Sequence, residues 1–181
     1  MNAVSNTSLI IFLSKISMLD KLFYVFKAIY IPPTVHKEIL KGKEKYSDEV
    51  LLISENIGKK IIIQKLNDRP RLFSKKLIKA IKGIHLGEAE AIALTKQLNL
   101  EKFLVDDKKG YKLAEMLDLT PLRTTQILLL FLKRKIINLE EFKEALLKLS
   151  KSGFWITLDV YELLLKNAEK LYKSSKKNSL G

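Results

Sequence analysis

Short apolar runs alternate with longer amphipathic stretches along the chain, and this alternation is the strongest constraint on its fold. Five of the runs are predicted to be strands, because they are rich in branched or aromatic residues and end at polar or proline-containing segments. They cover residues 3–5, 28–31, 60–64, 103–105 and 119–122. Helical spacing of apolar residues predicts helices at 9–16, 19–26, 34–40, 47–57, 74–84, 88–98, 109–117, 124–133, 139–149 and 159–172. Strands that alternate with helices form βαβ crossovers, so the sequence predicts an α/β domain with a parallel sheet.

The length of 181 residues is enough for one domain with a sizeable core. We expect residues 1–150 to form the main domain. Residues 151–181 are expected to add extra C-terminal helices and a polar, basic tail from Lys173, within the same globular unit.

Basic residues outnumber acidic ones by 33 to 20, which gives a formal net charge of +13 and a pI near 9.7. This excess makes a nucleic-acid or other acidic partner plausible, although a proteome that uses lysine for solubility is an alternative explanation. Residues 59–82 contain nine bases and one acid, Asp68. They form either a phosphate-contact surface or a solvated lysine face.

Several classes of site are excluded. The chain has no cysteine, which rules out disulfides, thiolate chemistry and cysteine-based zinc sites. No apolar run reaches the roughly 18 residues of a membrane helix, and no basic segment precedes Leu9–Leu13, so a cytoplasmic protein is expected. His36 and His85 are the only histidines and lack metal-ligand spacing, and neither a P-loop nor a dinucleotide-binding glycine motif is present.

Acidic side chains recur close to the carboxyl ends of the predicted strands. Glu38 follows the second strand, Glu88 lies in the first turn of the helix before the fourth, and Asp106 and Asp107 follow the fourth. Ligands of open α/β sheets bind at this edge, and clustered carboxylate oxygens suit Mg²⁺ or Mn²⁺. For each acid alone, the preference of helix N-termini for negative charge is a sufficient explanation. Their recurrence at one edge predicts a metal-dependent phosphodiesterase site.

Four segments in order resemble a PIN domain over roughly residues 1–150. They are Ala3–Ile10, the Pro-Pro-Thr-Val-His-Lys-Glu-Ile-Leu segment ending at Leu40, the Leu-Gly-Glu-Ala-Glu-Ala-Ile segment from Leu86, and Leu104–Lys109. More narrowly, the chain is similar to prokaryotic PIN-like proteins related to the toxin ribonucleases of toxin–antitoxin pairs. The resemblance implies a three-layer α/β/α sandwich with a mostly parallel sheet. It also implies Mg²⁺- or Mn²⁺-dependent endoribonuclease activity, homodimers and an antitoxin-like partner.

The family's acidic positions carry over to specific residues of this chain. By position, the resemblance maps the family's ligands to Asn6, Glu38, Glu88 and Asp106, with Asp107 adjacent. It implies that these five residues ligate the metal and that the four acids act in catalysis. Glu88 and Glu90 point about 200° apart on a helix, so at most one is expected to be a direct ligand, and the small residues after Glu88 favour it. On this basis Asp106→Asn is expected to abolish cleavage.

Asn6 stands where most active family members have aspartate. Its amide oxygen can still ligate a metal, but one negative charge is lost and metal affinity should fall. A catalytically inactive module that binds RNA or protein is therefore the alternative. A third possibility is an acidic cleft that receives an Arg or Lys of a partner chain.

Further residues are expected to contact substrate. Ser8 would bond the first-strand residue or a metal-bound water, or else cap the helix that begins there. Lys108, Lys109, Lys112 and Thr124 follow the fourth and fifth strands, where they could hold the RNA. Phe154 and Trp155 are interpreted as core or dimer contacts instead. The apolar stripe of Tyr161, Leu164 and Leu165 is expected to pack on a second subunit or on an antitoxin helix.

Overall fold

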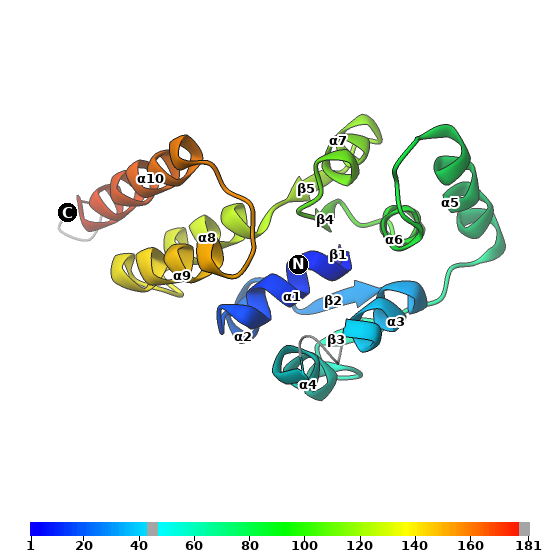
Figure 1. Ribbon diagram of the computed structural model, residues 1–181, viewed down its shortest axis with the longest axis horizontal. Coiled ribbons are helices and arrows are strands. Elements are labelled where there is room, and N and C mark those ends of the chain that lie inside the picture. The colour runs from blue at the N-terminus through cyan, green and yellow to red at the C-terminus, as the bar shows by residue number, and fades with distance from the viewer. Residues whose placement is uncertain (43–46, 178–181) are drawn as a thin grey trace.

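The computed structural model describes residues 1–42 and 47–177. In this part of the chain five strands form one all-parallel sheet in the order β3-β2-β1-β4-β5 (Figure 1). Their bounds are Asn2–Ser5 (β1), Ala28–Ile31 (β2), Ile61–Ile63 (β3), Lys102–Leu104 (β4) and Thr120–Leu122 (β5). The parallel sheet predicted from the sequence is thus confirmed.

Helices connect the strands and extend the chain beyond the sheet. The first five are α1 (Thr7–Lys15), α2 (Leu19–Val25), α3 (Pro33–Lys41), α4 (Ser47–Asn56) and α5 (Asp68–Ala80). The others are α6 (Leu86–Gln97), α7 (Lys108–Met116), α8 (Thr124–Lys133), α9 (Leu139–Lys151) and α10 (Leu158–Lys177).

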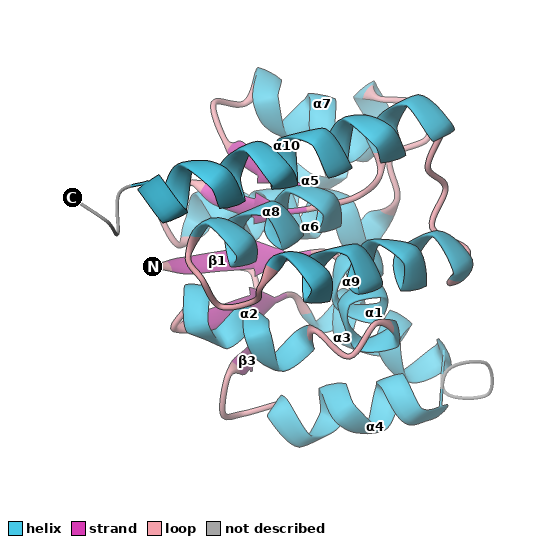
Figure 2. Cartoon of the chain, turned by 90° about the vertical axis from the view of Figure 1, so that its left-hand side faces the viewer, coloured by secondary structure: helices cyan, strands magenta, loops and turns pink. Residues whose placement is uncertain are grey.

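The sheet separates two hydrophobic clusters, and residues along each strand alternate between them. Ala3 and Leu104 belong to the larger cluster with α1–α4 and α8–α10, whereas Val4 and Phe103 belong to the smaller one with α5–α7. This alternation follows from the two-residue period of a strand. Figure 2 shows α8, α9 and α10 in front of the sheet, with α1 and α2 beside them. The three-layer α/β/α architecture is confirmed.

The strand order reverses at β1, which pairs with β2 on one side and with β4 on the other. The helix after β1 packs on one face of the sheet and the helix after β4 packs on the opposite face. A crevice therefore opens at the carboxyl ends of these two strands, as expected at a topological switch point.

The bounds of two helices differ most from the prediction. α5 runs from Asp68 to Ala80 instead of from Ser74 to Ile84. It can begin early because Pro70 lies in the first turn, where its missing N–H removes no helical hydrogen bond. α10 continues to Lys177, beyond the predicted end at Tyr172, while the last part of the predicted tail, 178–181, lies outside the described residues. In α10, Leu164 and Ala168 are buried in the larger cluster, and Tyr161 and Leu165 pack against it. This stripe therefore covers the chain's own core, and the expectation that it packs on a second subunit or an antitoxin helix is wrong. No helix within the described ranges is both long enough and apolar enough to cross a membrane.

Candidate metal centre at the carboxyl edge of the sheet

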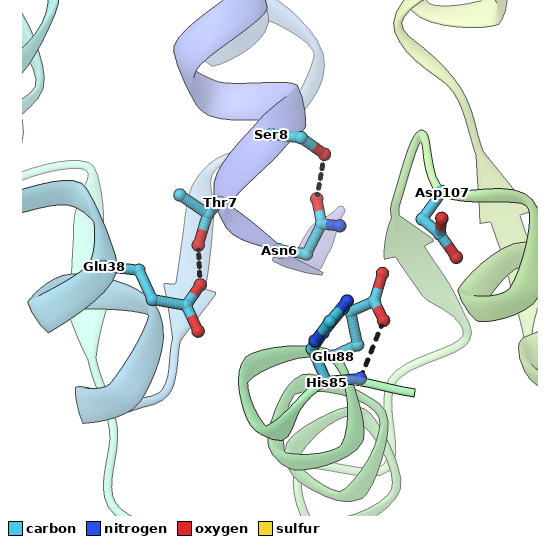
Figure 3. A pocket seen from close by; sticks show the side chains of 7 residues that line it. All are labelled: Asn6, Thr7, Ser8, Glu38, His85, Glu88 and Asp107. Atoms are coloured by element: carbon cyan, nitrogen blue, oxygen red, sulfur yellow. Dashed lines mark hydrogen bonds between the residues drawn. The ribbon is translucent and has the colours of Figure 1, made fainter. Parts of the chain in front are cut away.

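A pocket of about 440 Å³ lies at the switch point of the sheet. Its walls come from the starts of α1, α6 and α7 and from α3 (Figure 3). The lining residues are Asn6, Thr7, Ser8, Glu38, His85, Glu88 and Asp107. Three carboxylates thus share one pocket with an amide and two hydroxyls, and no Lys or Arg is among these residues.

Asn6 is the N-cap of α1 and directly follows β1. Its Oδ1 accepts hydrogen bonds from the Leu9 amide at 3.5 Å and from the Ser8 hydroxyl at 3.1 Å. The backbone N–H of Asn6 donates a hydrogen bond to the Leu104 carbonyl at 3.0 Å, which joins the end of β1 to β4. The side-chain oxygen Oδ1 of Asn6 is therefore bonded to the N-terminus of α1. Figure 3 shows the Nδ2 group of Asn6 on the side of Asp107.

Glu38 lies in α3, about one and a half turns after the prolines that end β2. The Thr7 hydroxyl donates a hydrogen bond to its carboxylate. The opposite side of this carboxylate is packed against Gly87 of α6, where a Cβ atom would lie 2.5 Å from Oε1 and 2.9 Å from Oε2. Only glycine fits at position 87 while Glu38 keeps this orientation.

Glu88 is buried in the first turn of α6. Its Oε2 accepts a hydrogen bond from the His85 amide at 3.2 Å, and its Oε1 faces Gly110 of α7, where a Cβ atom would lie 3.3 Å away. Burial raises the pKa of Glu88, as do the charges of Asp107 and Glu38, while the His85 amide opposes this change. The neighbouring carboxylates therefore add to the effect of burial in disfavouring the ionised form of Glu88.

Asp107 is the N-cap of α7. Its Oδ1 accepts hydrogen bonds from the amides of Lys109 at 2.7 Å and Gly110 at 3.0 Å. As with Glu88, one carboxylate oxygen is bonded to a helix N-terminus. Such bonds fix the side chain before any ligand arrives.

Asp106 points away from this pocket although it is adjacent to Asp107. Its carboxylate accepts hydrogen bonds from the amide of Thr124 at 2.8 Å and from the hydroxyl of Thr124 at 2.7 Å. Burial raises the pKa of Asp106 to about 6, opposed by the Thr124 hydrogen bonds and by the charge of Arg123. In this arrangement the Asp106 side chain joins the end of β4 to the start of α8 and does not line the pocket.

The remaining predicted residues divide between the pocket and its surroundings. Ser8 lines the pocket, whereas Thr124 is fully buried beside Asp106. Lys108, Lys109 and Lys112 are exposed and do not line it. The Nζ of Lys109 donates to the Lys82 carbonyl at 3.3 Å and so ties α7 to the loop before α6. Between the two candidate glutamates, Glu88 lines the pocket, while the carboxylate of Glu90 accepts a hydrogen bond from the Thr34 hydroxyl.

Three contributions were not predicted from the sequence. Thr7 holds Glu38, Gly87 makes room for it, and His85 both lines the pocket and donates to Glu88. The sequence carried a signal for Gly87, because a glycine directly before a functional glutamate indicates close packing. Thr7 and His85 carry no comparable signal, since their roles depend on contacts between segments distant in sequence.

Hard oxygen donors such as these fit Mg²⁺ or Mn²⁺. Within the described residues, however, no group of three or more His, Asp or Glu side chains is close enough to enclose a metal ion. Mg²⁺ usually keeps several of its waters and needs only one or two carboxylates as direct ligands. Glu88 and Asp107, whose charges interact and which each have one oxygen bonded to backbone amides, are the best-placed pair.

Similarity to known proteins identifies the family of the chain. No curated protein matches the chain. A family model described as a PIN domain matches residues 2–170, from β1 into α10. Since the match covers nearly the whole chain, it confirms the resemblance inferred from the four sequence segments, and the chain belongs to the PIN domain family.

Proposed function

We propose that this protein is an endoribonuclease that hydrolyses RNA phosphodiester bonds with the help of Mg²⁺ or Mn²⁺. PIN domains are generally nucleases that use divalent metal ions. The observation that supports the proposal most directly is the gathering of Glu38, Glu88 and Asp107 around one pocket without a Lys or Arg among its lining residues. Like charges held together destabilise one another, and a bound cation would remove that cost.

The chemistry divides between the ion and the side chains. When bound, the ion would activate water and neutralise charge that develops on the phosphate. Glu88 and Asp107 would hold it, because each is fixed by backbone amides and keeps a second oxygen for ligation. Glu38 would add negative charge from the opposite wall, held by Thr7. The Nδ2 group of Asn6 would donate to a phosphate oxygen, since its Oδ1 is bonded to the start of α1.

RNA as the substrate is supported by the charge distribution. The chain carries a formal charge of +13, yet its pocket is acidic. Lys108 and Lys112 are exposed on α7, which begins directly after Asp107. Basic side chains around an acidic metal site would hold the phosphates that flank the cleaved bond.

The test compares Glu88→Gln with Glu90→Gln. Both lie on α6, but only Glu88 lines the pocket, and a glutamine there keeps an oxygen for the His85 amide. With Mn²⁺ and labelled single-stranded and hairpin RNAs, Glu88→Gln should lose at least about 100-fold in kcat/KM. Glu90→Gln should stay within about threefold of the natural protein, since its partner is Thr34. Cleavage that survives EDTA, or that Glu88→Gln leaves unchanged, would contradict the proposal.

A second candidate function is an inactive PIN module that binds RNA or protein. It is favoured by Asn6, whose carbonyl oxygen is bonded to the start of α1, and by the wide spacing of the described carboxylates. Titration calorimetry with Mn²⁺ separates the two functions. Heat of binding that disappears in Glu88→Gln supports the nuclease, whereas no uptake together with salt-sensitive RNA binding supports the inactive module.

A further inference from the structure

A second pocket, of about 140 Å³, lies beyond β5. It is lined by Arg123 and Thr125 at the start of α8, by residues 154–157 of the loop between α9 and α10, and by Val160. The sequence interpretation placed Phe154 and Trp155 in the core or at a subunit contact. In the structure these two neighbours have opposite environments, and that difference is the basis for the inference.

Phe154 anchors the loop, while Trp155 is presented to solvent. The Phe154 ring packs edge-to-face on Phe12 of α1, with 5.0 Å between centroids and an interplanar angle of 84°. Trp155 is 85% exposed, the highest exposure among the large hydrophobic side chains of the described residues. The interpretation of Trp155 as a core residue is therefore wrong. A tryptophan that keeps its ring in water beside a pocket, on an anchored loop, is typical of a binding surface.

Arg123 supplies a positive charge to the same pocket. Its guanidinium lies over the ring of Tyr111 of α7, 4.7 Å from the centroid, and this contact fixes its position. None of the ion pairs among the described residues includes Arg123. Its charge influences the half-buried Asp106, but the guanidinium is itself only partly buried and can accept a further anionic partner.

The second pocket lies along the same edge of the sheet as the acidic pocket. Leu122 of β5 pairs with Leu104 of β4, so Arg123 and Asp107 both follow the carboxyl ends of neighbouring strands. The Thr124 bonds to Asp106 join these two strand ends directly. A single-stranded RNA that crosses the acidic pocket and follows this edge would reach Arg123 and then Trp155.

We propose that this pocket binds an unpaired base of the RNA, next to the cleaved bond. Trp155 stacks on the base, and Arg123 binds a phosphate between this base and the cleavage site. Combined stacking and cationic contacts are how proteins hold single-stranded nucleic acids without reading a long sequence. The inference rests on the proposed function, since it extends the path of the same substrate.

Intrinsic fluorescence tests the proposal, because Trp155 is the only tryptophan of the chain. The probe is a fluorescein-labelled 2′-O-methyl RNA of ten nucleotides, added in EDTA so that no cleavage occurs. Its binding, followed by anisotropy, should be accompanied by quenching of the tryptophan emission with the same midpoint. Binding without any quenching, or no binding at low salt, would overturn the proposal.

Substitutions separate stacking from charge. Trp155→Ala should weaken binding about tenfold, and Trp155→Phe should restore most of the loss because an aromatic face remains. Arg123→Gln should reduce the slope of log affinity against log salt by about one. Tyr24→Ala is the matched control, because Tyr24 is also an exposed aromatic, at 73%, but lies in α2 near the amino end of β2. It should bind like the natural protein.

The outcomes also distinguish this proposal from the nuclease proposal. If Trp155→Ala binds and cleaves RNA as well as the natural protein does, the base-binding pocket is refuted and the nuclease stands. Suppose that RNA quenches the tryptophan emission and that Trp155→Ala weakens binding, but no metal-dependent cleavage is found. The base-binding pocket then stands and the nuclease proposal fails. If Trp155→Ala instead dissociates a dimer in sedimentation velocity and leaves RNA binding unchanged, the surface is a contact between two copies, and the proposal is wrong.

Discussion

The two adjacent aspartates after β4 should respond in opposite ways to the same substitution. Asp106→Asn preserves the contact with Thr124, since the new oxygen can accept the amide and the new NH₂ can donate to the hydroxyl. Asp107→Asn preserves the N-cap of α7, because asparagine caps helices about as well as aspartate does. Both variants should therefore fold, and each loses one negative charge at a different place.

The expected effect of Asp106→Asn is on stability. The pKa of Asp106 is raised from 3.8 to about 6. Between these pH values the Asp106 carboxyl is therefore more often protonated in the folded protein than in the unfolded chain. Stability from this group is therefore present at low pH and lost as pH rises through about 6. The loss is at most about 3 kcal/mol, from roughly two pKa units at about 1.4 kcal/mol each. Asparagine, which cannot ionise, avoids this loss.

Thermal unfolding in EDTA measures this effect. The Tm of Asp106→Asn should match that of the natural protein near pH 4 and exceed it at pH 8, by up to roughly 6–12 °C at 2–4 °C per kcal/mol. Cleavage by Asp106→Asn should remain within about tenfold of the natural rate, whereas cleavage by Asp107→Asn should fall at least about 100-fold. If Asp106→Asn is inactive and Asp107→Asn is active, the assignment of Asp107 to the pocket is refuted.

Three further predictions concern the acidic pocket. Gly87→Ala should displace the Glu38 carboxylate and reduce the Mn²⁺ affinity measured by calorimetry. The Tm in EDTA should stay the same or rise, because alanine favours the helix. An unchanged affinity would show that Glu38 plays no part in metal binding. Asn6→Asp should raise the Mn²⁺ affinity about tenfold, because a further carboxylate attracts the ion. It should lower the Tm in EDTA, because without the ion this carboxylate repels the others in the pocket. An unchanged affinity would contradict this reasoning. Saturating Mn²⁺ should raise the Tm of the natural protein but not of Glu88→Gln, and an equal rise in both would place the ion elsewhere.

Much of the site was predictable because its acids follow a topological rule. Parallel strands deliver their carboxyl ends to one edge, so Glu38, Glu88 and the aspartate pair were expected to meet there, and the pocket includes an acid from each segment. Helix starts were less predictable, because α5 begins six residues early at a turn that contains Pro70. A proline near a helix start is compatible with either side of the boundary.

The choice between Asp106 and Asp107 could not be made from the sequence. Both are acids at the end of the same strand. The segment resemblance carries the strand-ending aspartate over to Asp106, with Asp107 adjacent, whereas Asp107 is the one that lines the pocket. The alternation of β4 directs Leu104 and Asp106 toward the α8 side of the sheet, while Asp107 turns toward α7 and caps it. Which side contains the pocket depends on where α1, α6 and α7 pack, and this is a property of the assembled chain.

The amino-acid sequence by itself determined the strand and helix alternation, the parallel sheet and the edge at which acidic side chains gather, because these follow from local periodicity and from the direction of each strand. Only the tertiary structure decided which oxygens face the pocket, that Gly87 leaves room for Glu38, and that Trp155 stays in water while Phe154 is packed on α1. These features depend on contacts between residues far apart in the chain, and local sequence patterns carry no information about such distances.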